Sequence, residues 1–150
     1  MHIASHLEKI EHFESARRRL DPLEDFELWF WATMVSGTNA VNAALHHAGV
    51  TPAESAFPSQ PGVYHVPQPH GEALAVLKDL GDVLHVGRPP IKAPVPEDIA
   101  AMMKAMDRIE AYRDPCTRGE MDINQQVVAD CEGAYEQCLR LMNKRLNGGK

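Results

Sequence analysis

The sequence predicts an all-α, single-domain bundle of four main helices plus a short one, with a long proline-rich loop. Apolar residues recur at spacings of three and four along several long stretches, which is typical of amphipathic helices. No stretch combines the alternating pattern of strands with regular turns between them, so a sheet-based class is disfavoured. A chain of 150 residues can bury one core without a disulfide or a metal.

The first two predicted helices span 3–20 and 22–48. The first has a single apolar stripe, and its other faces are charged. Asp21 is a capping residue and Pro22 suits the first helical position, so the second helix should begin there. Its middle is apolar nearly all round, and it stops at Gly49. This pattern predicts the central helix of the bundle.

Trp29 and Trp31 lie in the middle of this helix. Residues two apart face different sides of a helix, so one of the two rings can stay exposed and contact a partner protein. The second helix has more apolar faces than the helices of one chain would cover. We therefore expect a homodimer.

Three further helices are predicted, at 72–80, 97–112 and 122–146. The first of them is short and ends at Gly81, and residues 82–87 either continue it or form a brief extended segment. The other two carry clear apolar faces, and they complete the bundle.

The connection at 50–71 contains five prolines and is too long to be an ordinary loop. Apolar residues between the prolines indicate that it packs across the surface, with a short extended piece at 64–66. A small-ligand site or an enzyme site under this loop is therefore an alternative function. Its polar groups would be Tyr64, His65, His70 and His85, with His46 or His47 from the end of the second helix.

Charge and composition exclude several classes. The formal charge of −6 argues against general binding of nucleic-acid backbones, although Arg17, Arg18 and Arg19 could form a small anion site. An odd number of cysteines, three, does not make a secreted disulfide framework. The first residues are charged where a signal peptide needs an apolar core, and no apolar stretch approaches the ~20 residues of a membrane span. We expect a cytoplasmic protein that does not enter membranes.

No metal or cofactor is expected from the histidine pattern. The spacing of the histidines matches no zinc motif, and the paired Glu-x-x-His motifs of di-iron bundles are absent from the sequence. His2 and His6 have the one-turn spacing of a ligand pair, but they stand at a terminus that we expect to fray.

One segment contains a motif of charged residues that could bind a ligand or take part in a reaction. Between Met106 and Gly119 the sequence reads MDRIEAYRDPCTRG, which resembles the signature of the HEPN family. That signature is an arginine, a polar residue, a few variable residues and then a histidine, often followed by glycine. Arg113, Asp114 and Gly119 match it, whereas Arg118 stands where the family has histidine. Residues 3–48 and 97–146 also resemble the helices of that family.

The resemblance implies a small helical bundle of the kind found in toxin–antitoxin and nucleotide-linked systems. Members that cleave RNA are thought to use the arginine and the histidine around a 2′-hydroxyl and a phosphate. An arginine cannot act as a general base near neutral pH, so ribonuclease activity is disfavoured. Arg113 and Arg118 can still hold a small anion or a nucleotide. The sequence therefore favours a non-catalytic HEPN-like module that binds an anion, a nucleotide or a protein partner. A simpler interpretation is that both arginines pair with nearby carboxylates at a helix end.

Overall fold

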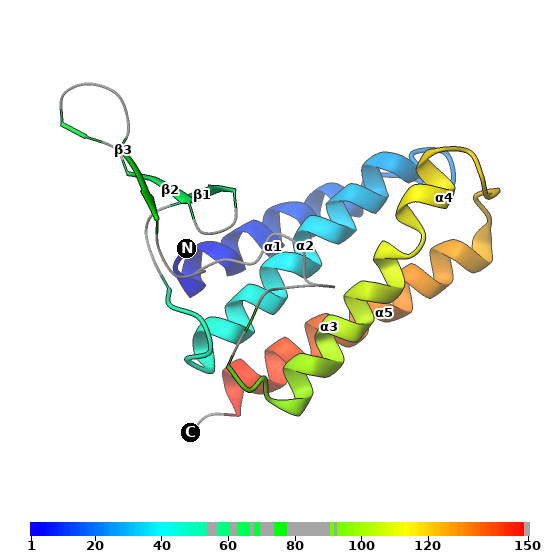
Figure 1. Cartoon of the computed structure of the whole chain (residues 1–150). Coiled ribbons are helices and arrows are strands. Elements are labelled where there is room, and N and C mark those ends of the chain that lie inside the picture. Colours follow the sequence, from blue (N-terminus) through cyan, green and yellow to red (C-terminus); the bar gives the residue numbers. More distant parts are fainter. Residues whose placement is uncertain are drawn as a thin grey trace.

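The computed structural model describes residues 1–53, 57–60, 63–66, 68–69, 74–77, 91 and 93–148. It confirms the predicted fold class, an all-α bundle in a single domain. Five helices lie within the described ranges, four long and one short, and they run roughly along a common direction (Figure 1).

Helices α1 (Ile3–Arg17) and α2 (Phe26–His47) form an antiparallel pair. Helix α1 ends at Arg17, before the predicted end at 20, and α2 begins at Phe26, after the predicted start at 22. The amides of Leu23 and Glu24 donate to the Asp21 carboxylate, at 2.9 and 3.2 Å. Asp21 therefore caps a turn, and α2 begins only after it.

The C-terminal end of α2 agrees with the prediction. Gly49 has a φ of +68°, a left-handed conformation that glycine adopts without strain. The amide of Gly49 donates to the carbonyl of His46 at 3.1 Å and closes the helix end.

Helices α3 (Glu97–Glu110) and α5 (Gln125–Asn147) form the second antiparallel pair, and the short α4 (Arg113–Thr117) joins them (Figure 1). The side chain of Asn124 accepts from the amides of Gln126 and Val127, at 2.9 and 3.1 Å. Asn124 is thus the capping residue of α5, and the predicted start at 122 was too early.

The core lies between the two helix pairs. Phe30, Ile99 and Met106 are fully buried there, and α2 contacts α1, α3 and α5. Gly37 lets α2 and α3 approach closely, since a Cβ added to it would lie 2.5 Å from Cε of Met106. The central position predicted for α2 is therefore correct. No helix among the described residues is long and apolar enough to cross a membrane.

A small antiparallel sheet follows α2. Strand β2 (Val63–Val66) pairs with β1 (Phe57–Gln60) on one side and with β3 (Leu74–Leu77) on the other. The extended piece expected at 64–66 is confirmed. The helix expected at 72–80 is wrong for residues 74–77, because they pair with β2 in register from Val66 with Leu74 to Val63 with Leu77. The rest of that predicted helix, and residues 82–87, lie outside the described residues.

Candidate functional site

The predicted site residues Arg113, Asp114 and Arg118 lie on or next to α4. The Arg113 guanidinium donates to Glu110 at 3.1 Å and to Asp114 at 3.2 Å. Arg118 lies 3.7 Å from the same Asp114 oxygen, and its side chain is 69% exposed. The three residues are therefore brought together, but as ion pairs among themselves.

These contacts reduce the capacity of the α4 segment to bind an anion. Two guanidinium groups face the two carboxylates of Glu110 and Asp114, so the local formal charges cancel. Gly119, which matches the end of the motif, has a φ of +74° and occupies the left-handed position that follows a helix. A helix-end role accounts for these contacts and this conformation without a ligand.

The residues expected under the loop fall in different places. Tyr64 and His65 lie in β2, whereas His70 and His85 lie outside the described residues. At the end of α2, His47 is exposed and His46 is buried. Of the two histidines considered there, the structure makes His46 the inward one.

A buried polar cluster surrounds His46, where α1 packs against α2. It combines His6, Asn39, His46 and Thr51, which are between 1% and 8% exposed. Nδ1 of His6 lies 2.8 Å from Oδ1 of Asn39, and the two imidazole centroids are 5.2 Å apart. Nδ1 of His46 lies 2.9 Å from the Thr51 hydroxyl and 3.1 Å from the Thr51 carbonyl oxygen. We call these four residues the histidine cluster.

The partners of the two imidazoles differ in kind. Nδ1 of His46 lies against both the Thr51 carbonyl oxygen, which only accepts, and the Thr51 hydroxyl, which can donate or accept. The Asn39 amide group donates to the Val35 carbonyl at 2.7 Å, which turns the Asn39 oxygen toward His6 as an acceptor. Nδ1 of His6 therefore donates to the Asn39 oxygen, because an amide oxygen only accepts.

A second buried cluster centres on Arg17, near the other end of α1. Its guanidinium donates to the Thr33 hydroxyl at 2.8 Å, to Glu14 at 2.6 Å and to Glu132 of α5. It also lies over the Tyr135 ring, 4.3 Å from the centroid. Arg17 is 6% exposed, so one cation joins three helices and forms cation–π contacts with little competition from water.

Tyr135 extends this arginine cluster into the core. Its hydroxyl lies 2.6 Å from the Ser36 hydroxyl, and burial raises the pKa of the phenol well above its ordinary value. The phenol thus stays protonated at neutral pH. Among the described residues, no buried side-chain nitrogen or oxygen lacks a hydrogen-bond partner.

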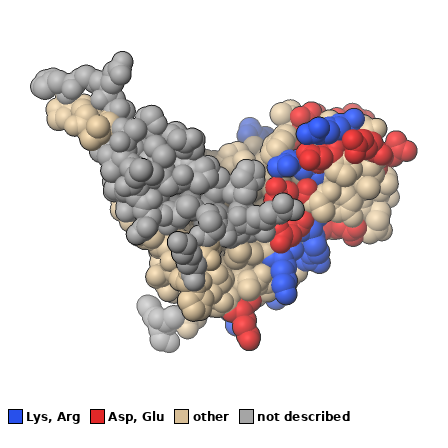
Figure 2. Space-filling model, viewed as in Figure 1, with Lys and Arg blue, Asp and Glu red and all other residues tan. Residues whose placement is uncertain are grey.

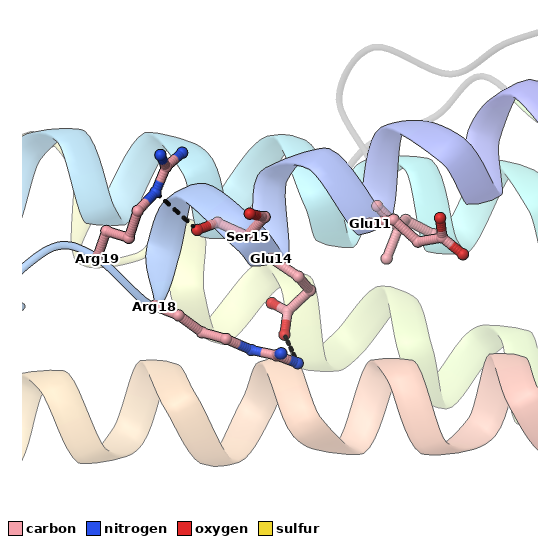
Figure 3. Close-up of a pocket in the computed structure, with 6 residues that line it drawn as sticks. Glu11, Glu14, Ser15, Arg18 and Arg19 are labelled. Atoms are coloured by element: carbon pink, nitrogen blue, oxygen red, sulfur yellow. Dashed lines mark hydrogen bonds and ion pairs between the residues drawn. The ribbon is translucent and has the colours of Figure 1, made fainter.

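A shallow hollow of about 440 Å³ lies beside the arginine cluster (Figure 3). The side chains that line it all come from α1 and the turn after it: Ile10, Glu11, Glu14, Ser15, Arg18 and Arg19. Glu14 belongs to both the hollow and the buried cluster, and Arg18 pairs with it at 3.7 Å. The two arginines and two glutamates balance in formal charge, so the hollow favours neither cations nor anions.

The outward face of α2 is apolar. Leu28, Trp31 and Val35 are 65%, 42% and 37% exposed and recur at helical spacing, one turn apart. Trp29, two positions from Trp31, is only 3% exposed. The prediction that the two tryptophans face different sides is confirmed. We call Leu28, Trp31 and Val35 the α2 stripe.

The charged side chains present a contrasting pattern. On the face of the molecule drawn in Figure 2, acidic and basic side chains are interspersed over the described part. No single sign dominates on that part of the surface.

Sequence reasoning missed both buried clusters. The sequence pattern places His6 at a terminus expected to fray and Arg17 in a basic run that could form a small anion site. In the structure, His6 contacts Asn39, 33 residues away, and Arg17 contacts Glu132, 115 residues away. One signal was available in the sequence. His6 and Arg17 each stand one position from the predicted apolar stripe of the first helix, on the edge that a second helix can cover.

Comparison with known proteins adds no family and no relative to these observations. No protein-family model matches the chain, and neither a curated protein nor a solved structure does. Among the described residues, no group of three or more His, Cys, Asp or Glu side chains is placed to hold a metal ion.

Proposed function

We propose that the chain is a non-catalytic, HEPN-like interaction module that pairs with a second copy of itself through the α2 stripe. The exposed Leu28–Trp31–Val35 face carries this proposal. Three large apolar side chains in one row on a helix are typical of a contact surface rather than of scattered exposed residues.

The charge distribution along α2 favours a second copy in antiparallel orientation. Asp25 and Glu27 lie at the start of the helix, and no Asp, Glu, Lys or Arg follows from residue 28 to its end. A parallel pair would bring both acidic ends together, which is unfavourable. An antiparallel pair instead sets each acidic end against an uncharged part of its partner.

The spacing of the stripe is also self-complementary. A twofold axis beside Trp31 sets Leu28 of each copy against Val35 of the other, with the two Trp31 rings adjacent. Such a contact is isologous, because the same patch serves both subunits. Its centre is an aromatic anchor of the kind that dominates binding energy in protein interfaces.

A form of the module that binds an anion or a nucleotide at α4 has weaker support. Its arginines are already paired with Glu110 and Asp114, and an incoming phosphate would have to compete with those carboxylates. For this reason the protein-partner form of the module is preferred to the nucleotide-binding form.

The test is the oligomeric state of the full chain as a function of concentration, measured by sedimentation equilibrium. We expect a dimer, and Trp31→Glu should weaken it by about 30-fold or more because a charge enters the centre of the contact. Met121→Glu is the matched control, since Met121 is also 42% exposed but lies outside the stripe. A wild-type chain that stays monomeric, or a dimer disrupted only by Met121→Glu, would contradict the proposal.

A second candidate is a small-ligand site at the end of α2, favoured by the histidine cluster. Four buried polar side chains converge next to the residue where the chain leaves α2. This candidate keeps the sequence-based idea of a site close to the 50–71 loop. Its histidines are the buried pair His6 and His46, and the exposed His47 is not part of it.

A further inference from the structure

We propose that Glu27 limits the strength of self-association through the α2 stripe, because each copy sets its Glu27 carboxylate against the apolar surface of the other. The inference rests on the proposed function and adds a regulation of the same contact. Three observations carry it: the place of Glu27 beside the stripe, the lack of a partner for its carboxylate, and its position relative to the twofold axis.

The first observation is the place of Glu27. It stands in the first turn of α2, four residues before Trp31. Side chains four apart on a helix are neighbours on its surface, so Glu27 lies at the edge of the α2 stripe. Both Glu27 and Trp31 are exposed. A contact centred on Trp31 therefore includes Glu27.

The second observation is that the Glu27 carboxylate has no hydrogen bond or ion pair within the part of the chain that the structure describes. Glu14 and Glu110, by contrast, each pair with an arginine. A carboxylate without such a partner is stabilised by water, and moving it to an apolar surface is unfavourable. The charge of Glu27 therefore opposes coverage of the stripe.

The third observation is the position of Glu27 relative to the proposed twofold axis beside Trp31. Glu27 is four residues before Trp31, and Val35 is four residues after it. An antiparallel pair therefore sets Glu27 of one copy against Val35 of the other. Helix α2 contains no Lys or Arg, so the facing helix supplies no cation to Glu27.

Magnitudes separate two causes by which the charge could weaken the contact. With a rise of 1.5 Å per residue, the two Glu27 positions lie about 12 Å apart along the paired helices. That distance exceeds the screening length of about 8 Å at physiological salt, so their mutual repulsion is weak. The larger cost is the loss of water from each carboxylate beside Val35 of the other copy. Added salt reduces repulsion but does not restore that water.

The experiment is sedimentation equilibrium of the full chain and of Glu27→Gln, at about 0.15 and about 0.5 M NaCl. We expect Glu27→Gln to lower the dimer Kd by about three- to tenfold, and the ratio to persist at the higher salt. The matched control is Glu136→Gln, which removes the same charge from an exposed position on α5. It accounts for the change in the net charge of −6, and it should leave Kd unchanged.

A second pair of variants tests which residues face each other. Val35→Lys places a cation where the proposal sets Glu27 of the other copy. In this background Glu27→Gln should weaken the dimer instead of strengthening it, because it removes the partner of the introduced lysine. Within one chain the two positions are more than two helical turns apart. The change of sign therefore reports on the contact between copies.

The outcomes distinguish this inference from the proposed function. An unchanged Kd in Glu27→Gln, an equal gain in Glu136→Gln, or a gain that disappears at high salt would overturn the role of Glu27 while the wild-type dimer remained. A Val35→Lys chain that is monomeric at every concentration, or one in which Glu27→Gln still strengthens the dimer, would overturn it as well. If the wild type and Glu27→Gln are both monomeric, the proposed function itself fails.

Discussion

Arg17 and Arg113 are two arginines with the same number of acidic partners and different surroundings. Arg17 pairs with Glu14 and Glu132, and Arg113 pairs with Glu110 and Asp114. The Arg113 partners lie within three residues of it, and its side chain is 30% exposed. One partner of Arg17 is 115 residues away, and Arg17 is 6% exposed. A count of neighbouring charges does not distinguish the two sites, whereas burial does.

The difference has an energetic consequence. A partly exposed ion pair is screened by water and contributes little to stability, about 0–1 kcal/mol. Removing one member of a buried group is costly because the remaining charges lose their partner in a place that water reaches poorly. The buried arginine should therefore hold the helices together, while the motif arginine should not.

The largest expected effect is that of Arg17→Met, which keeps much of the side-chain volume and removes the charge. Glu14 and Glu132 would face each other without the guanidinium, and the contact with the Tyr135 ring would change. Because Glu132 is itself 40% exposed, we expect the free energy of unfolding to fall by about 3 kcal/mol, the lower end of the range for buried groups. Urea denaturation measures it.

The same substitution elsewhere makes the comparison direct. Arg113→Met should cost under about 1 kcal/mol, and Arg18→Met, at a side chain that is 79% exposed, should cost even less. Equal losses at Arg17 and Arg113 would show that burial does not set the difference between them.

A third arginine pair has intermediate exposure and adds a pH dependence. The guanidinium of Arg145 contacts both oxygens of Asp98, and the two side chains are 20% and 33% exposed. Its hydrogen bonds lower the pKa of Asp98 below the ordinary value of 3.8. Since the folded pKa is the lower one, this pair stabilises the fold above about pH 4, and the contribution is lost as pH falls through the folded pKa.

Asp98→Asn should therefore cost about 1 kcal/mol or less at pH 7, after allowance for solvent screening. It should cost progressively less at more acidic pH. Chemical denaturation at several pH values from 7 to 3 measures this convergence. Glu97→Gln, at the exposed neighbour, is the control and should leave the wild-type slope below pH 4 in place. Parallel curves for wild type and Asp98→Asn would refute the assignment.

The same contrast shows how far the sequence predicts this molecule. Helical periodicity predicted the four long helices and the two faces of α2, because both depend on spacing along one element. The strand β3 was misread as a helix, since a short apolar run fits either structure until a pairing partner is known. The histidine cluster and the Arg17 contacts were missed because they depend on which edge of α1 meets α2 and α5. The position of His6 and Arg17 beside the apolar stripe shows that another helix can cover them, but no local pattern shows which helix does so.

The smallest expected effect concerns Arg118, the residue at the motif's histidine position. Its side chain is 69% exposed, and its one ion pair among the described residues is to Asp114 at 3.7 Å. Arg118→Ala should change the free energy of unfolding by less than about 0.5 kcal/mol.

If the α4 arginines acted as a phosphate site, the variant would also weaken binding of a nucleotide such as AMP. We expect thermal-shift titrations with AMP to give the same weak response in both proteins, because Asp114 and Glu110 already occupy Arg113. A clear AMP-dependent rise in melting temperature that Arg118→Ala abolishes would return the functional site to α4, and the exposed arginine would then matter more than the buried one.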